Sequence, residues 1–147
     1  MQAHPPDEPR IPLPPRPLRG VAVVIPRGSR LLVIRRSALV RAPRMYCFPG
    51  GGLEAGESEA EAVVREVREE LRVEVQPIRP LWSSVTPWSV ELSWWLAELP
   101  DGHEPAANPQ EVESVHWLEL SEIRQLPQLL ASNHHFLDAC DRGEIRW

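Results

Sequence analysis

The stretch from residue 48 to residue 73, FPGGGLEAGESEAEAVVREVREELRV, constrains this chain more than any other segment. It opens with glycines, which allow backbone conformations and close approaches that other residues exclude. Ser58, followed three residues later by Glu61, has the pattern of a helix capping box. We therefore expect a glycine-rich turn that leads into a helix. The apolar side of this helix is formed by Ala60, Ala62, Val63, Val64, Val67 and Leu71.

Three glutamates of the same helix share one face. Glu66, Glu69 and Glu70 stand at positions i, i+3 and i+4, where like charges repel each other. A hard divalent cation such as Mg2+ would remove this repulsion, and it commonly bridges protein carboxylates to substrate phosphates. Taken alone, the three glutamates are more typical of an acidic face exposed to solvent. The wider spacing of the segment favours the metal.

That spacing is specific. Five residues separate Gly51 from Glu57, and seven separate Glu57 from the pair Arg65-Glu66. The segment resembles the Nudix box, G-x5-E-x7-R-E-U-x-E-E-x-G-U, where U is a bulky apolar residue. Every position matches except the second glycine, which is Arg72 here. That glycine falls at the helix end, where a left-handed residue is common, so the departure concerns how the helix ends and not which residues would hold metal.

The resemblance implies an α/β domain with the Nudix fold, in which a mixed β-sheet lies between α-helices. It also implies a metal-dependent hydrolase that cleaves the diphosphate linkage of a nucleotide by attack of water on phosphorus. By carry-over, Glu66, Glu69 and Glu70 would hold Mg2+, with Mn2+ as a substitute and the Gly50 carbonyl as a further ligand. Glu57 and Arg65 would form an ion pair that positions the loop against the helix.

An acidic segment precedes a strand that contains a tryptophan, at residues 111–118. Many Nudix proteins have a similar segment downstream of the box, where a glutamate can serve as an extra metal ligand or as a general base. Glu111 is the first candidate for this role and Glu113 is the second.

A basic loop precedes the box. Arg35, Arg41 and Arg44 could bind substrate phosphates, because a guanidinium group pairs well with phosphate oxygens. An ordinary solvated loop explains these arginines equally well.

The rest of the chain is consistent with one domain. Residues 1–19 hold seven of the seventeen prolines and are expected to form an extended or disordered arm, whereas residues 20–147 form a single domain. We expect a hairpin of strands at 21–25 and 31–34, an edge strand near 73–78, and strands at 90–99 and 114–118. A helix capped by Ser121 should follow, which Pro127 either kinks or divides into two short pieces, and then a last helix at 134–141. Most of Trp82, Trp88, Trp94 and Trp95 should pack in the core, although one or two could stack on a base.

Composition excludes several classes of protein. A net charge of −5 argues against a general nucleic-acid surface, and two cysteines form neither a disulfide framework nor a zinc pattern. Without a membrane span or an export signal, we expect a cytoplasmic protein that is a monomer or homodimer.

The substrate class is less constrained than the chemistry. A nucleoside di- or triphosphate derivative is the first hypothesis, with ADP-ribose or a nucleotide sugar as the alternative. Pro87 lies at the place of an ADP-ribose marker, but its surroundings match poorly, and the lack of a tyrosine after the box weakens a dinucleoside polyphosphate reading. A domain that binds nucleotides without hydrolysing them is the alternative of another class. It is disfavoured because all the box glutamates are present.

Overall fold

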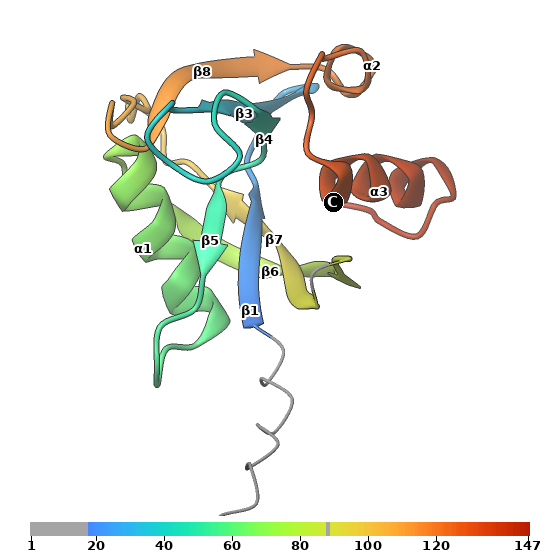
Figure 1. The fold of residues 1–147 in the computed structure, drawn as a ribbon, viewed down its shortest axis with the longest axis horizontal. Coiled ribbons are helices and arrows are strands. Elements are labelled where there is room, and N and C mark those ends of the chain that lie inside the picture. Colours follow the sequence, from blue (N-terminus) through green and yellow to red (C-terminus); the bar gives the residue numbers. More distant parts are fainter. Residues whose placement is uncertain (1–17, 88) are drawn as a thin grey trace, which may run out of the picture.

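The structure is a computed structural model, and it describes residues 18–87 and 89–147. In this part of the chain the strands form two four-stranded sheets with helices on both sides (Figure 1). The first sheet has the order β5-β1-β7-β6. β1 (Leu18–Val24) runs parallel to β7 (Val90–Glu98), while β5 (Gly50–Gly52) and β6 (Gln76–Val85) are antiparallel to their neighbours. This sheet is mixed, as the resemblance implies.

The second sheet is antiparallel and is built around β3 (Arg30–Arg36). This strand pairs with β2 (Pro26–Arg27), β4 (Tyr46–Cys47) and β8 (Val112–Leu118). β1 and β3 therefore pair only near the turn between them and do not form the full hairpin that the sequence predicts. The backbone of β1 is hydrogen-bonded to β5 and β7 in the other sheet. Only β2 and the Ile25 carbonyl, which accepts from the Leu32 amide at 3.1 Å, join the two strands.

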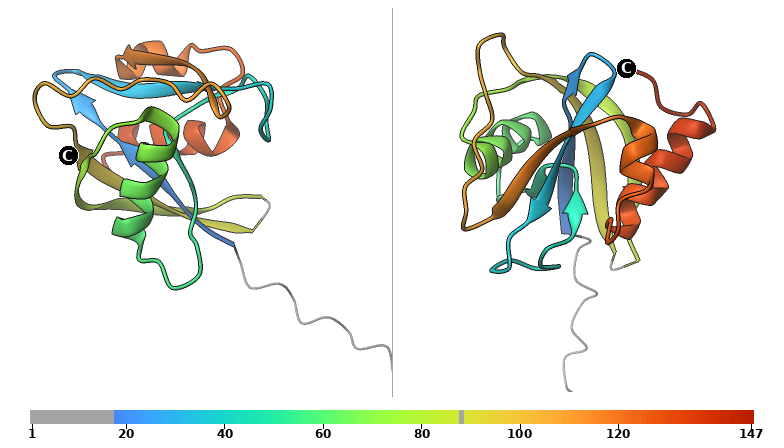
Figure 2. Two further views of the ribbon diagram at one scale, coloured as in Figure 1. Left: turned by 90° about the vertical axis from the view of Figure 1, so that its left-hand side faces the viewer. Right: turned by 90° about the horizontal axis from the view of Figure 1, so that it is seen from above.

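The helices cover opposite faces of the strands. α1 (Glu59–Leu71) lies on one side, and α2 (Leu120–Arg124) and α3 (Ala131–Asp141) lie on the other, as the view from above shows (Figure 2). This arrangement confirms the predicted layers of helix, sheet and helix.

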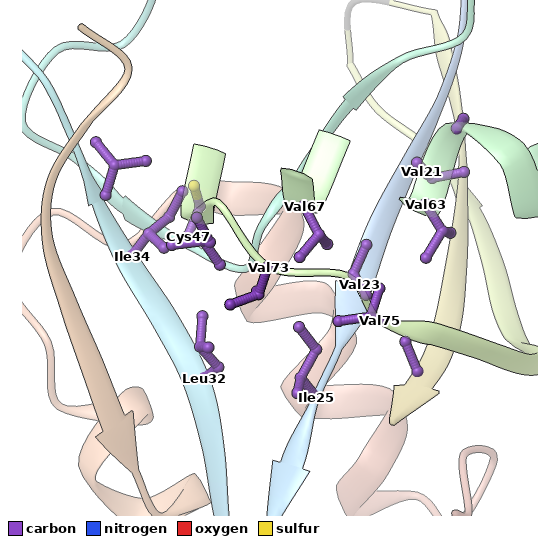
Figure 3. Close-up of a cluster of buried hydrophobic side chains, with 14 residues drawn as sticks. Val21, Val23, Ile25, Leu32, Ile34, Cys47, Val63, Val67, Val73 and Val75 are labelled. Atoms are coloured by element: carbon purple, nitrogen blue, oxygen red, sulfur yellow. The ribbon is translucent and has the colours of Figure 1, made fainter. Parts of the chain in front are cut away.

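Two apolar clusters fill the space between these layers. The first, drawn in Figure 3, lies beneath α1 and the second lies beneath α3. The side chains of β1 alternate between them. Val21 and Val23 belong to the first cluster, whereas Ala22 and Val24 belong to the second. Because β1 and β3 are buried on both faces, their sequences are continuous apolar runs and do not alternate with polar residues.

The N-terminal end of α1 follows the sequence prediction, and the structure shows how the helix ends at Arg72. The Ser58 side chain accepts from the Glu61 amide, and the Glu61 carboxylate accepts from the Ser58 amide, so the capping box forms. At the other end Arg72 adopts the left-handed conformation, with φ 55° and ψ 31°. The arginine therefore takes a left-handed conformation that glycine adopts more readily.

One prediction near the C-terminal end is corrected. The cap of α2 is Glu119 and not Ser121, because the Glu119 amide donates to the Glu122 carboxylate at 3.0 Å and the helix has already begun at Leu120. Pro127 lies between α2 and α3 and separates two helices. β6, with Pro77 and Pro80, is an edge strand as predicted.

The described part of the chain begins within the predicted arm. Residues 1–17 lie outside it, but Leu18 and Arg19 already belong to β1, so the domain starts earlier than residue 20. Trp94 is fully buried in the second cluster, and Trp88 lies outside the described residues. Among the described helices, none has the length and apolar character needed to cross a bilayer.

Candidate active site

The turn that leads into the box is held at three successive residues. The Phe48 amide donates to Asn133 Oδ1 at 2.9 Å, and the Pro49 carbonyl accepts from the Val23 amide at 2.8 Å. The Gly50 amide donates to Glu70 Oε1 at 2.8 Å. The turn is therefore fixed to α3, to β1 and to α1 at once.

Gly50, just before the box, and Gly51, its first residue, both make close contacts that a side chain would disturb. A Cβ atom at Gly50 would overlap the Val21 carbonyl oxygen, because the turn runs directly against β1. A Cβ atom at Gly51 would lie 2.5 Å from the carboxylate carbon of Glu66. Gly51 thus leaves the space that the Glu66 side chain occupies.

Glu57 and Arg65 form the ion pair that the sequence predicts. Arg65 donates through Nε to Glu57 Oε2 at 2.6 Å and through Nη2 to Glu57 Oε1 at 2.8 Å. The Arg65 guanidinium holds the pKa of the Glu57 carboxyl at about 2, well below its usual range. Arg65 Nη2 also donates to the Gly52 carbonyl at 2.8 Å, so this pair fastens the loop to the helix.

Three carboxylates beside this pair lie close enough to disfavour one another's negative charge. Burial raises the pKa of Glu66 and raises that of Glu70 further. The negative charge of Glu111 adds to the rise in both pKa values, which places its carboxylate near both. Glu111 Oε2 is buried and has no hydrogen-bond partner among the described residues. Burial and mutual repulsion therefore disfavour the charged forms of Glu66 and Glu70.

Glu69 belongs to the same helix face but is more open to solvent. Its side chain is 45% exposed, against 13% for Glu66. Within residues 18–87 and 89–147, no group of three or more acidic, histidine or cysteine side chains converges closely enough to hold an ion as placed. Hydrogen bonds explain this arrangement, because Arg65 draws Glu66 and Glu69 while the Gly50 amide holds Glu70.

The donor set nevertheless fits a hard divalent ion. Glu66, Glu69, Glu70 and Glu111 offer carboxylate oxygens, which are the ligands that Mg2+ and Mn2+ prefer. The unpartnered Oε2 of Glu111 and the raised pKa values of Glu66 and Glu70 are the features that a bound cation would relieve.

The loop before β8 brings Glu111 to the box helix. Asn108 donates through its amide to the Glu70 carbonyl at 2.9 Å and through Nδ2 to the Glu69 carbonyl at 3.0 Å. The Ala106 amide donates to the Leu71 carbonyl at 2.8 Å. These bonds satisfy carbonyls at the end of α1 and fix Glu111 beside it, because the Glu111 amide donates to the Asn108 carbonyl at 3.0 Å.

The second candidate, Glu113, lies elsewhere. Its carboxylate pairs with Arg35 at 3.3 Å and with Arg44 at 3.9 Å, on the side of the basic loop. Arg35 also donates to the Arg44 carbonyl at 3.0 Å and lies over the Tyr46 ring, and Arg41 is exposed. The structure thus groups Arg35 and Arg44 around Glu113, whereas the Arg41 carbonyl accepts from Arg36 Nε at 2.7 Å.

Sequence reasoning missed two residues of this site. Asn133 is buried in α3 and binds the Phe48 amide across 85 positions of sequence, which no local pattern indicates. The positive charge of Arg36 opposes the rise in the pKa of both Glu70 and Cys47. Burial has the larger effect and raises the pKa of the Cys47 thiol to about 12. In the sequence, Arg36 ends the strand directly after Arg35, which is one of the predicted phosphate-binding residues.

Two polar hollows of the described surface lie away from these carboxylates. One, of about 500 Å3, is lined by Arg19, Glu59 and the strand ends around Ser83 and Ser93. The other, of about 470 Å3, lies between the turn at Gly28 and residues 98–104. Neither hollow is lined by Glu66, Glu69, Glu70 or Glu111.

Comparison with known proteins gives a consistent result. Residues 16–140 match the model of the NUDIX domain. The chain is 34% identical over 125 residues to the NAD-capped RNA hydrolase NudC of Pseudomonas aeruginosa (strain LESB58), which covers 84% of this chain and 44% of that protein. It is 32% identical over 113 residues to the NudC of Stutzerimonas stutzeri, with 77% and 40% covered. The chain thus spans less than half the length of these curated relatives.

Solved structures have a similar fold. DR0079 from Deinococcus radiodurans superimposes with a TM-score of 0.70 and 26% identity, with 84% of this chain and 82% of that chain covered. The MutT protein from Methanosarcina mazei Go1 gives a TM-score of 0.73 at 22% identity, with 88% and 96% covered.

Proposed function

The chain belongs to the NUDIX domain family, and we propose that it is a metal-dependent hydrolase that cleaves the diphosphate linkage of a nucleoside di- or triphosphate derivative. The observation that carries the proposal is the group of carboxylates Glu66, Glu69, Glu70 and Glu111 at the end of a glycine-rich turn. Burial and neighbouring carboxylates raise the pKa of Glu66 and Glu70 although Arg65 and Arg36 lie near them, and Glu111 Oε2 has no hydrogen-bond partner among the described residues. A stable protein gains nothing from such an arrangement unless a ligand neutralises it.

The residues have separate roles in this proposal. Glu66, Glu69 and Glu70, with the Gly50 carbonyl, would hold Mg2+ or Mn2+, which supplies polarisation of the phosphoryl oxygens and a bound water of lowered pKa. Glu57 and Arg65 position the loop against the helix. Glu111 accepts the proton of the attacking water at its free Oε2. The oxygen of that water then forms the new bond to phosphorus as the bond to the bridging oxygen breaks.

Arg35, Arg41 and Arg44 are the proposed partners of the substrate phosphates. Arg35 and Arg44 are bound to Glu113 in the free protein, so phosphate oxygens would compete with that carboxylate. The site is open to solvent at Glu69, which suits a substrate that brings its own ligands to the metal.

A second substrate class is favoured by the relatives. The matched NudC proteins are NAD-capped RNA hydrolases, and such a cap contains a diphosphate between two nucleosides. Hydrolysis of a dinucleotide diphosphate, free or at an RNA end, is therefore the second candidate beside ADP-ribose and nucleotide sugars. The relatives are more than twice as long as the matched segment, so the substrate does not transfer directly.

A substrate panel tests the proposal. Nucleoside triphosphates, ADP-ribose, a nucleotide sugar, NAD and NAD-capped RNA are each incubated with Mg2+ or Mn2+, and released phosphate and nucleotide are measured. We expect metal-dependent release from at least one substrate, and its loss in Glu70→Gln. Tight nucleotide binding without turnover under either metal would favour the non-catalytic alternative.

A further inference from the structure

We propose that Arg65 is an internal counter-cation that a divalent ion has to displace from Glu66 and Glu69. This inference rests on the metal site of the proposed function and adds a step to it. Metal binding would then be an exchange of one cation for another, and not the filling of a free carboxylate cluster.

The guanidinium group of Arg65 uses all of its donors. Arginine offers five N–H groups, and five hydrogen bonds are made here, to Glu57 twice, to the Gly52 carbonyl, to Glu66 and to Glu69. The side chain is only 18% exposed. Arg65 is thus fixed in place between the loop and the helix.

The two edges of this group have different partners. Nε and Nη2 bind Glu57 and the Gly52 carbonyl, and neither belongs to the glutamates proposed to hold the metal. Nη1 donates to Glu66 Oε1 at 3.0 Å and to Glu69 Oε2 at 3.2 Å. The Nη1 end can therefore lose its partners while Glu57 keeps the other edge, so the exchange needs no movement of the helix.

The charges make the exchange a competition. Arg65 remains a cation at any pH at which the protein is folded, so it offsets the repulsion between Glu66 and Glu69 when no metal is bound. A divalent ion that takes these carboxylates must break two charge-assisted hydrogen bonds. Arg65 should therefore lower the metal affinity of the free protein, and Glu57 should limit this effect by holding the guanidinium from the far side.

An alternative role predicts the opposite sign. If Arg65 only orients Glu66 for the metal, its loss should weaken metal binding by about 10- to 100-fold. If Arg65 competes with the metal, its loss should tighten binding. The sign of the change in affinity separates the two roles without any measurement of activity.

The test is calorimetric titration of Mn2+ into the full chain without nucleotide. We expect Arg65→Gln to bind Mn2+ on the order of tenfold more tightly than the wild type, since charge-assisted hydrogen bonds no longer oppose binding. Arg68→Gln is the matched control, because it removes the same charge from the same helix but Arg68 pairs with Glu74. This control should change affinity by less than about twofold, because exposed charges interact weakly.

A second variant covers the case in which Arg65→Gln does not fold. Glu57→Gln removes the charge that holds Nε and Nη2 of Arg65, so the guanidinium should interact more strongly with Glu66 and Glu69. This variant should therefore bind Mn2+ more weakly than the wild type, which is the opposite of the change expected for Arg65→Gln. Equal or tighter binding by Glu57→Gln, or equal or weaker binding by Arg65→Gln relative to Arg68→Gln, overturns the inference while leaving the proposed metal site intact. A wild type that binds no Mn2+ overturns the metal site itself, and the inference with it.

Discussion

The Gly50 amide donates a 2.8 Å hydrogen bond to the carboxylate of Glu70, twenty positions further along the chain. This bond joins the turn of the box to the end of its helix. It also gives the buried Glu70 a hydrogen-bond donor, in a place where burial and the charges of Glu66 and Glu111 raise its pKa. Glu70 is therefore held in position at a cost in electrostatic free energy.

Replacement of Glu70 should have opposite effects on stability and turnover. In Glu70→Gln the amide oxygen can still accept from Gly50, and one buried charge is removed. The free energy of unfolding without metal should be unchanged or raised, by at most about 0.5 kcal/mol for each relieved pair of like charges. Turnover should fall on the order of 100-fold or more, because a metal ligand is lost.

Chemical denaturation in EDTA and steady-state kinetics measure the two effects. Glu91→Gln, at an exposed position of β7, is the control and should alter neither quantity. Turnover that stays at the wild-type level in both Glu70→Gln and Glu66→Gln would refute the catalytic assignment.

The stability of the metal-free protein should fall as pH rises above about 4.5, the ordinary pKa of a glutamate. The pKa of Glu70 is raised on folding, so above that value the folded state keeps a proton that the unfolded state has released. The free energy of unfolding then decreases with pH until the folded pKa is passed. Denaturation in EDTA between pH 4.5 and 8 should show this slope, and Glu70→Gln should flatten it. An unchanged slope in the variant would contradict the assignment.

Glu57 should contribute the opposite dependence at lower pH. Its pKa is lowered from 4.5 to about 2 by Arg65, so between these values the unfolded state binds the extra proton. The stabilisation is complete above about pH 4.5 and is lost as pH falls towards 2. Acid denaturation of Glu57→Gln should lack this component, whereas the exposed Glu113→Gln should keep it.

Gly51→Ala should disturb the site more than Gly52→Ala. A Cβ atom at Gly51 would lie 2.5 Å from the Glu66 carboxylate, whereas the nearest atom to one at Gly52 is the Arg19 carbonyl oxygen at 3.9 Å. We expect Gly51→Ala to displace Glu66 and to weaken Mn2+ binding by about 10-fold or more. Calorimetry on both variants measures this, and equal affinities would show that Glu66 has no part in metal binding.

Asn133→Ala should destabilise the protein and loosen the turn of the box. It leaves the buried Phe48 amide without an acceptor, which costs about 1–3 kcal/mol in the free energy of unfolding. His135→Ala, on the exposed side of α3, is the control. Hydrogen exchange at the Phe48 amide should accelerate in the first variant alone, and protection that persists there would show that another group binds this amide.

Local sequence patterns predicted the parts of the site that lie close together in the chain. The Ser58–Glu61 capping box follows from local spacing and the Glu57–Arg65 pair from the family resemblance, and both lie within one loop and helix. The left-handed conformation of Arg72 did not follow from the sequence, because arginine does not favour it as glycine does. Carry-over from the family placed Glu111 beside the box, and its effect on Glu66 and Glu70 agrees with that position.

The parts that sequence could not predict depend on distant contacts. Asn133 reaches Phe48 from the last helix, and nothing around it marks a buried polar residue. β1 and β3 read as one hairpin, but the neighbours that separate them into two sheets are β7 and β8, far along the chain. Ser121 is a better cap residue than Glu119 by propensity, yet the helix begins earlier.

The bonds from Ala106 and Asn108 to the end of α1 divide the connection between β7 and β8 into two functional parts. The part after Ala106 is fastened to the box helix and carries Glu111, so it must keep its length and geometry. The part before it, around the exposed Asp101 and Gly102, makes no such bonds to α1. Insertions there could reshape the rim of the molecule, and so its choice of partner or substrate, without moving the residues assigned to the chemistry.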